Sequence, residues 1–338
     1  MRIIKGLGAN TQMLSWSNTR KLIVSLSVFA ILMIIVAALY AAVPAGEENG
    51  LAIDYPEKWD IKWELIKVID KGVDWVIVTG DPVFAIINIA ILRGILSPME
   101  DYLLWLPWWV IIIIMGCLAW YTVGKKFAVV SMCFIGLMTV MGLLDLACQT
   151  LAIMLTSTLV CVALGLPLGI LTALNNIVNI IMRPVLDAMQ TMPIFVYLIP
   201  SVMLFGLGKV PAVIATCIYA LPPIIRLTNL GIRQVDTQLV EAARSFGSTR
   251  WQILIKLQIP MALSTILAGL NQTVMMALGM VVVASMIGAR GLGVEIFRAI
   301  SRLEVGRGLI AGIGIVFLAM ILDRISQGLA RKSKPRAT

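Results

Sequence analysis

Long apolar runs dominate the chain, and short polar segments separate them. Runs of about 20 residues with almost no charge match the length of an α-helix that crosses the hydrocarbon core of a bilayer. A transmembrane barrel would instead show strands of about 10 residues with alternating polarity, and this pattern does not occur here. We therefore interpret the chain as an all-α polytopic membrane protein with about eight transmembrane helices. They cover residues 22–43, 104–123, 127–146, 150–174, 193–207, 210–230, 260–287 and 309–327.

Two segments near the N-terminus do not fit the spanning pattern. The most polar stretch of the chain follows the first run, and within it residues 59–78 carry apolar side chains at helical spacing. This pattern predicts an amphipathic helix on the outer membrane surface. The run 83–96 has about 14 residues, contains Arg93 and ends at Ser97-Pro98. It is too short to span comfortably, so we predict an interfacial or re-entrant helix there.

The basic residues predict how these helices are oriented. With the N-terminus in the cytoplasm, the predicted cytoplasmic segments hold 17 of the 27 Lys and Arg residues. Because cytoplasmic loops carry an excess of Lys and Arg, we predict that both termini are cytoplasmic. The run 22–43 follows four basic residues but lacks a clear small-residue cleavage site, which favours an uncleaved first helix over a signal peptide.

The composition excludes several other classes of protein. With 60% hydrophobic and only 13% charged residues, the chain is not a soluble globular domain. The net charge of +9 is spread over loops and tails, which favours membrane orientation over a nucleic-acid partner. The five cysteines show no metal-site spacing and there is no histidine, so we predict no metal site and interpret the cysteines as small core residues.

Shifts in composition also predict how the chain is divided. We expect an N-terminal membrane part over residues 1–148, a five-helix transmembrane core over 149–328 and a basic cytoplasmic tail over 329–338. No repeat relates the two halves, so the sequence does not support transport by inverted repeats within one chain.

The longest predicted cytoplasmic loop, residues 233–259, has the pattern of two short helices. Asp236 can cap the first helix by accepting from the free amides of its first turn. Gly247 can adopt the left-handed conformation that ends it. Thr249 and Gln252 have capping-box spacing for a second helix. The sequence therefore predicts an ordered elbow rather than a flexible linker.

One face of the first loop helix carries an apolar strip. Leu239, Ala242, Ala243 and Phe246 share this face, and Glu241 flanks it. A narrow strip of small and apolar residues is shaped to lie in the groove of another protein. An amphipathic loop that rests on the bilayer would have the same spacing, and the pattern alone does not separate the two.

A motif in the same loop resembles a known family. Glu241-Ala242-Ala243, three residues, Gly247, nine residues and Leu257-Gln258-Ile259-Pro260 are similar to the EAA loop of ABC importer membrane subunits, usually written EAAxxxG, nine residues, IxLP. Ile and Leu are exchanged around Gln258. In that family the loop is a coupling helix that seats in a cleft of the cytoplasmic ATPase. The resemblance implies a coupling role for Leu239, Glu241, Ala242, Ala243, Phe246, Gly247 and Pro260.

Further segments resemble a narrower group, the permeases of bacterial glycine betaine/proline betaine importers. The similar segments are residues 104–109, 165–169, 183–193, 203–206, 220–228 and 285–293. The resemblance covers nearly everything after about residue 71, whereas the first helix, 22–43, departs from the family pattern. It implies a type I ABC importer core that imports glycine betaine, proline betaine or a related quaternary ammonium osmoprotectant by alternating access.

The same resemblance implies partners and a location. A homodimer of the permease, surrounded by membrane lipid, would sit in the bacterial cytoplasmic (inner) membrane. Two cytoplasmic ATPase subunits would bind ATP and Mg, and an extracytoplasmic substrate-binding protein would deliver the substrate. No cofactor is expected in this chain.

Catalysis and ion-coupled transport are the alternatives to transport driven by an ATPase. An enzyme is not favoured, because the chain has no GxxxxGK[ST] phosphate loop, no histidine and no close carboxylate pair away from its acidic outer segment. An ion-coupled secondary transporter usually keeps carboxylates inside its spans. Here Asp145, Arg226 and Asp323 lie near predicted span ends. We therefore expect that the driving force comes from outside the chain.

A translocation path is the remaining site that the sequence offers. Residues around the start of the span 193–207 combine polar and soft apolar side chains, which suits a cavity, although an ordinary packed core explains them equally well. They are Met189, Gln190, Thr191, Met192 and Phe195.

Overall fold

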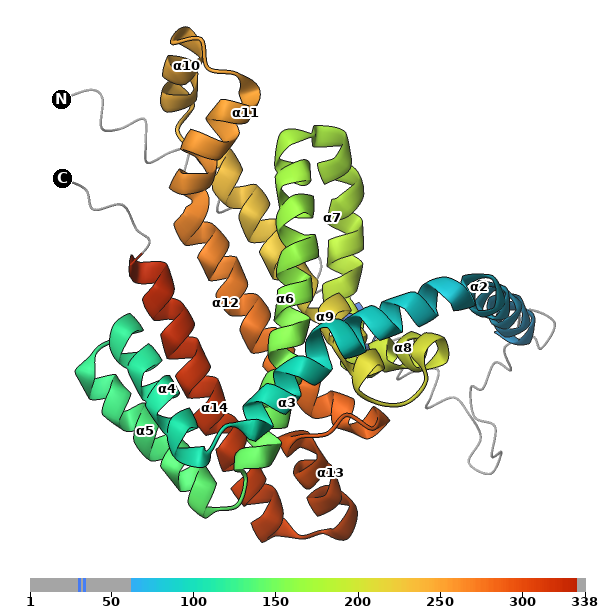
Figure 1. The fold of residues 1–338 in the computed structure, drawn as a ribbon. Coiled ribbons are helices and arrows are strands. Elements are labelled where there is room, and N and C mark those ends of the chain that lie inside the picture. Colours follow the sequence, from blue (N-terminus) through green and yellow to red (C-terminus); the bar gives the residue numbers. More distant parts are fainter. Residues whose placement is uncertain (1–29, 32, 35–61, 333–338) are drawn as a thin grey trace. The chain divides into compact units, whose positions relative to one another are not determined.

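The computed structural model describes residues 30–31, 33–34 and 62–332 (Figure 1). Every regular element in this part of the chain is a helix. The predicted first span, 22–43, lies almost entirely outside the described residues. The chain divides into two compact units, Met1–Asp74 and Trp75–Thr338, and the helices from the second half of α2 onward belong to the second unit.

The number of long apolar helices is smaller than predicted. Among the described residues, five helices are long and apolar enough to cross a membrane, or six if a bent pair counts as one span. The sequence predicted seven spans in the same region. The difference comes from three places where proline and glycine break or join helices in ways that hydropathy does not predict.

The first difference is a long helix where we predicted a short interfacial one. α2 (Lys62–Ile91) continues through a π-helical turn, η2 (Leu92–Leu96), into α3 (Ser97–Trp105). Together they form a 44-residue candidate span. The prediction of a separate helix over 83–96 is therefore wrong. Pro98 does not stop the helix because it lies in the first turn of α3, where its missing N–H costs little.

The second difference is a hairpin of two short helices. α4 (Trp108–Thr122) and α5 (Lys125–Val140) pack against each other, and Gly124 joins them with a φ of +131°. The predicted span 127–146 is wrong at its end, because a turn at Met141-Gly142 separates α5 from α6. At 15 and 16 residues, each helix extends about 23 Å, less than the roughly 30 Å of the hydrocarbon core.

The third difference is a broken helix. α7 (Asn176–Thr191) meets η3 (Ile194–Tyr197) and α8 (Leu198–Phe205) at an angle of 111°. The break falls at Met192-Pro193, where both residues have extended backbone dihedrals. Proline disfavours helical conformation in the residue before it, which explains the position of the break. The predicted span 193–207 is therefore one arm of a bent pair rather than a straight span.

The core consists of long helices that approach closely at glycines. α9 (Lys209–Arg233) packs most extensively against α6 (Leu144–Leu174) and α12 (Ile259–Ala284). A Cβ atom on Gly165 would lie 2.3 Å from a methyl carbon of Ile224, so only glycine permits the observed α6–α9 distance. Small residues at helix contacts are typical of membrane bundles, where close packing replaces the hydrophobic driving force.

The last helices of the chain, from α12 onward, connect the two ends of the bundle. α12 begins after α10 (Thr237–Ser245), α11 (Arg250–Ile253) and η4 (Leu254–Gln258), and it ends at η5 (Ser285–Ile287) before α13 (Leu292–Arg302). α14 (Val305–Lys332) then runs back beside α12. Figure 1 shows α10 and α11 at the upper end of the bundle and α13 at the lower end.

Candidate functional site

The elbow segment, residues 236–253, folds as its local sequence signals predict. The Asp236 carboxylate accepts from the backbone N–H of Gln238 at 2.9 Å, which caps α10. Gly247 has a φ of +80°, and its N–H donates to the Arg244 carbonyl at 2.8 Å. These contacts satisfy backbone groups that a helix end leaves free. The predicted glycine elbow is confirmed.

The second helix of the elbow segment is also confirmed. The Thr249 hydroxyl accepts from the backbone N–H of Gln252, and the Gln252 side chain accepts from the backbone N–H of Thr249 at 2.8 Å. Pro260 lies in the first turn of α12, as its position in the sequence predicted. Because α11, η4 and α12 follow one another without a break, the elbow segment is attached to a helical stretch of 38 residues.

The tip of the elbow segment carries exposed apolar side chains. Phe246 is 89% exposed, and Leu239 also lies on the surface. Glu241 and Ala242 are exposed, whereas Ala243 is half-buried. Trp251 is exposed as well and was not predicted. An aromatic residue in the first turn of the second short helix is the feature of the sequence that could have identified Trp251.

A cavity of about 380 Å³ lies behind this tip. The end of α6 contributes Ala173 and Leu174, and the elbow segment contributes Val240, Arg244 and Trp251 among others. Exposed apolar residues beside a hollow, on a segment fixed by caps, form a surface suited to contact with another protein.

The predicted path residues gather at the bend between α7 and α8. Met189 is half-buried, and its carbonyl accepts a hydrogen bond from the Tyr197 hydroxyl. Thr191, Met192 and Phe195 are exposed. The hydrogen bond between Tyr197 and Met189 ties the two arms of the bend together.

Gln190 differs from the other predicted path residues because it reaches across to α9. The Arg226 guanidinium donates to the Gln190 side-chain oxygen and to the Asp187 carboxylate. Local sequence patterns do not predict this contact, because Arg226 lies 36 positions from Gln190 and 39 from Asp187 in the chain. A cavity of about 360 Å³ lies beside it between α6, α7 and α9.

Two charged residues that lie near predicted span ends are placed well inside helices of the structure. Arg226 precedes the end of α9 by about two turns. Asp323 lies well inside α14, where it accepts from Asn271 of α12 at 3.2 Å and from Gln327 at 2.8 Å. Their helices extend beyond the predicted spans 210–230 and 309–327, to Arg233 and Lys332. Both residues are paired with polar groups, which lowers the cost of placing them in an apolar helix.

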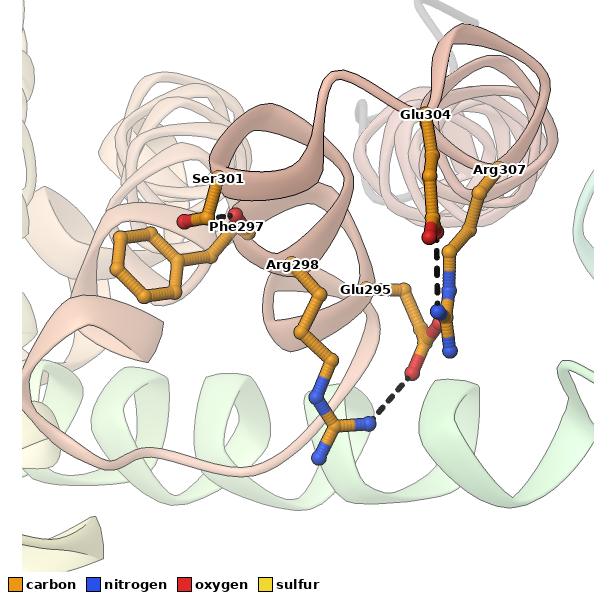
Figure 2. A network of polar contacts seen from close by, with 6 residues as sticks. All are labelled: Glu295, Phe297, Arg298, Ser301, Glu304 and Arg307. Carbon is orange, nitrogen blue, oxygen red and sulfur yellow. Dashed lines mark hydrogen bonds and ion pairs between the residues drawn. The ribbon is translucent and has the colours of Figure 1, made fainter.

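A second charged cluster fixes α13 against the start of α14 (Figure 2). Glu295 accepts from Arg298 at 3.0 Å and from Arg307 at 2.6 Å, and Glu304 accepts from Arg307 at 3.1 Å. Burial raises the pKa of Glu295, but the hydrogen bonds and charges of Arg307 and Arg298 outweigh it and hold that pKa below its usual value. The cluster joins the two helices by ion pairs.

The described residues do not assemble a centre for metal chemistry. No group of three His, Cys, Asp or Glu in this part of the chain is placed to hold a metal ion. The prominent features are a bundle of long apolar helices and a broken helix with polar groups beside a cavity. A third feature is the exposed elbow segment, which continues into the 38-residue helical stretch Arg250–Ile287. These features define a membrane-embedded transport component.

Comparison with known proteins gives the same class. Residues 165–335 match the family described as the binding-protein-dependent transport system inner membrane component, and the chain belongs to this family. It is the inner-membrane permease component of an ABC transporter and not its ATPase, which confirms the class that the elbow motif indicated.

Two relatives and one solved structure illustrate the similarity. The chain is 47% identical over 268 residues to the glycine betaine/proline betaine transport system permease protein ProW of Escherichia coli (strain K12), covering 79% of this chain and 75% of that protein. It is 49% identical over 253 residues to the glycine betaine/carnitine transport permease protein GbuB of Listeria monocytogenes, covering 72% and 89%. A chain of the MetNI methionine ABC transporter, solved in inward facing conformations, shares the fold with a TM-score of 0.51 and 21% identity, covering 55% of this chain and 94% of that chain.

Proposed function

We propose that this chain is the permease subunit of an ATP-driven importer of glycine betaine, proline betaine or a related quaternary ammonium osmoprotectant. The observation that carries the proposal is near-half identity, over most of both chains, to permeases whose names specify glycine betaine together with proline betaine or carnitine. An ATPase and a substrate-binding protein are the partners that this function requires.

The elbow segment is the proposed contact with the ATPase. Leu239, Glu241, Ala242, Ala243 and Phe246 supply the contact surface, Gly247 sets its shape, and Pro260 starts the helix that carries the movement. The proposal is supported by the exposed Phe246 and by the caps that hold the segment in one conformation. A capped helix in a groove transmits a displacement instead of absorbing it.

The proposed core consists of α6, the bent pair α7–α8, α9, α12 and α14, which corresponds to residues 149–328. Residues 1–148 form the N-terminal part and 329–338 the cytoplasmic tail. In the proposed arrangement two copies form a homodimer, both termini are cytoplasmic and eight spans cross the membrane. This count requires that the 44-residue stretch Lys62–Trp105 stays on the outer side. It also requires that α4 and α5 each cross the membrane, although each extends only about 23 Å.

Transport in a reconstituted system tests the function. In proteoliposomes that contain the permease and its ATPase, uptake of labelled glycine betaine should require the external binding protein and ATP on the ATPase side. Uptake should survive an ionophore that collapses proton and sodium gradients. Uptake that persists without the ATPase and disappears with the ionophore would establish an ion-coupled secondary transporter instead.

A further inference from the structure

Four hydrogen bonds join α7 and the end of α6 to α9 in a polar seam. Arg226 binds Asp187 and Gln190, and one turn further along α9 the Asn229 amide donates to the Asn179 side chain at 3.1 Å. The fourth hydrogen bond runs from the Arg233 guanidinium to the Thr172 carbonyl at 2.8 Å. The polar seam consists of Thr172, Asn179, Arg183, Asp187, Gln190, Arg226, Asn229 and Arg233.

The periodicity of the seam shows that it is a continuous face. On α7 its members are spaced by four, four and three residues, and on α9 by three and four. Residues at these spacings lie on one side of a helix. The seam therefore extends for about three turns along α7 and about two turns along α9.

The Asp187–Arg226 pair of the seam is more exposed to solvent than the Glu100–Lys209 pair. The side chain of Glu100 is only 7% exposed where it meets Lys209, which is 27% exposed. Asp187 is 68% exposed and Arg226 39% exposed. Both line the cavity of about 360 Å³, together with Thr172, Asn179, Arg183 and Asn229. Asp187 and Arg226 are therefore accessible to a small molecule in this cavity, which a purely structural ion pair does not require.

Ionisable residues inside membrane helices are costly and are expected to serve a function. We infer that the polar seam is a contact site inside the permease for a small zwitterion with one carboxylate and one cationic group. This inference rests on the proposed function, because it names the site through which the betaine passes. Arg226 and Arg183 can hold the carboxylate by charge-assisted hydrogen bonds, and Asp187 can balance the cationic group.

The seam is built for weak binding. Its lining holds no aromatic ring that could enclose a quaternary ammonium group by cation–π attraction. A site on a permeation path must release its solute as readily as it accepts it. Capture at high affinity is then left to the external binding protein, and the seam supplies charge compensation during passage.

Protection of a cysteine from labelling tests the site directly. In a cysteine-free permease, assembled with the ATPase and binding protein, Leu230→Cys places a thiol in the lining. Millimolar glycine betaine should slow its reaction with a small methanethiosulfonate reagent at least about threefold, and choline, which lacks the carboxylate, should protect less. Ile181→Cys, an exposed position on the opposite face of α7, is the matched control and should not respond.

Uptake and ATP hydrolysis, measured together, separate a cargo role from a packing role. Arg226→Gln and Asp187→Asn should each lower betaine uptake per ATP hydrolysed by about tenfold, which corresponds to the loss of one charge-assisted contact of roughly 1.4 kcal/mol. The double exchange Asp187→Arg with Arg226→Asp restores a pair but reverses its charges, and it should not restore uptake.

Three results would overturn the inference while leaving the proposed function intact. They are unprotected labelling of Leu230→Cys in a complex that transports betaine, full uptake in the double exchange, and an efficient cross-link between two copies at Leu230→Cys that marks the seam as a subunit interface. Absence of betaine uptake by the unmodified complex would instead contradict the proposed function.

Discussion

Glycine residues serve two distinct purposes in this chain. At Gly169 a Cβ atom would lie 2.6 Å from Cβ of Thr228 and 3.0 Å from the Ile225 carbonyl oxygen, so the absence of a side chain permits contact between α6 and α9. At Gly247 no atom lies within 4 Å of such a Cβ, but φ is +80°. The first position is limited by space and the second by backbone conformation.

Replacement of Gly169 should destabilise the bundle. Gly169→Leu forces α6 away from α9, because a carbonyl oxygen cannot rotate aside as a flexible side chain can. We expect a loss of about 1–3 kcal/mol or more, measured as a lower midpoint of thermal unfolding in detergent. Gly279→Leu in α12 is the control, since nothing lies within 4 Å of a Cβ there. Equal midpoints for the two variants would contradict this account.

Replacement of Gly247 should weaken the contact with the ATPase without unfolding the bundle. Gly247→Val places a β-branched residue at positive φ, which costs about 1–2 kcal/mol and favours a different elbow geometry. The ATPase should co-purify less with this variant and uptake should fall. Gly247→Asn tolerates positive φ and should retain most of both. Wild-type co-purification of Gly247→Val would remove the elbow from the coupling mechanism.

At the scale of helices, two ion-pair clusters secure segments that flank the core. Glu100 of α3 binds Lys209 at the start of α9 with both carboxylate oxygens, at 2.6 and 2.7 Å. The Glu295 cluster joins α13 to α14 (Figure 2). The first pair is buried on its acidic side, whereas the arginines of the second are more exposed. Their expected contributions therefore differ.

Loss of one partner of the Glu100–Lys209 pair should be costly. Glu100→Ala leaves the Lys209 ammonium partly buried without its carboxylate, and breaking a buried pair in this way costs about 3–5 kcal/mol. The thermal unfolding midpoint of the purified permease measures the loss. The double variant Glu100→Ala with Lys209→Met also removes the unpaired ammonium and should recover a large part of the lost thermal stability. If the double variant is less stable than Glu100→Ala, the pair is not the reason for the loss.

The contribution of Glu295 should depend on pH in a defined direction. Because its folded-state pKa lies below the usual value, its stabilising effect is fully present above the ordinary glutamate pKa of about 4.3 and is lost as the pH falls through the lower folded pKa. Glu295→Gln should therefore lower the unfolding midpoint at pH 7, and the gap to wild type should close below about pH 4. A gap that widens in acid would contradict the assignment. Glu304→Gln, at the more exposed pair, should show a smaller effect at every pH.

The elements that the sequence predicted well are those set by neighbouring residues. The caps at Asp236 and Thr249 and the positive φ of Gly247 depend on contacts within a few positions, so short-range patterns identify them. The break at Pro193 and the continuity through Pro98 depend on whether the rest of the fold tolerates a proline. Hydropathy does not contain that information, so the prediction missed the pairing of α7 with α8 and the long helix through residues 83–96.

The polar seam illustrates why the site was only partly predictable. Gln190 was identified as a path residue from its local setting, but Arg226 was placed near a span end. The contact between them exists because α7 and α9 pack side by side, 36 positions apart in the chain. A regular spacing of polar residues on α7, at 179, 183 and 187, is the one local sign of the seam in the sequence.

For the whole molecule, the position of the elbow segment connects the two proposed sites. It joins the end of α9 to the helical stretch that becomes α12. Arg226, Asn229 and Arg233 of the seam lie on the last three turns of α9. A displacement of the elbow by the ATPase is therefore applied to the helix that carries one side of the seam. We expect the width of the seam to change with the nucleotide state, because tightly packed helices move as rigid bodies.

This mechanism requires that the elbow segment and α13 face opposite sides of the membrane. Phe246 at the elbow and Leu303 after α13 lie beyond opposite ends of α12 and are 89% and 87% exposed, so a cysteine at either position can react freely. On a cysteine-free background, a membrane-impermeant maleimide should label Leu303→Cys in intact cells. Phe246→Cys should react only after permeabilisation, since a cytoplasmic ATPase can reach the elbow from that side alone. Labelling of Phe246→Cys in intact cells would place the elbow outside and contradict coupling through it.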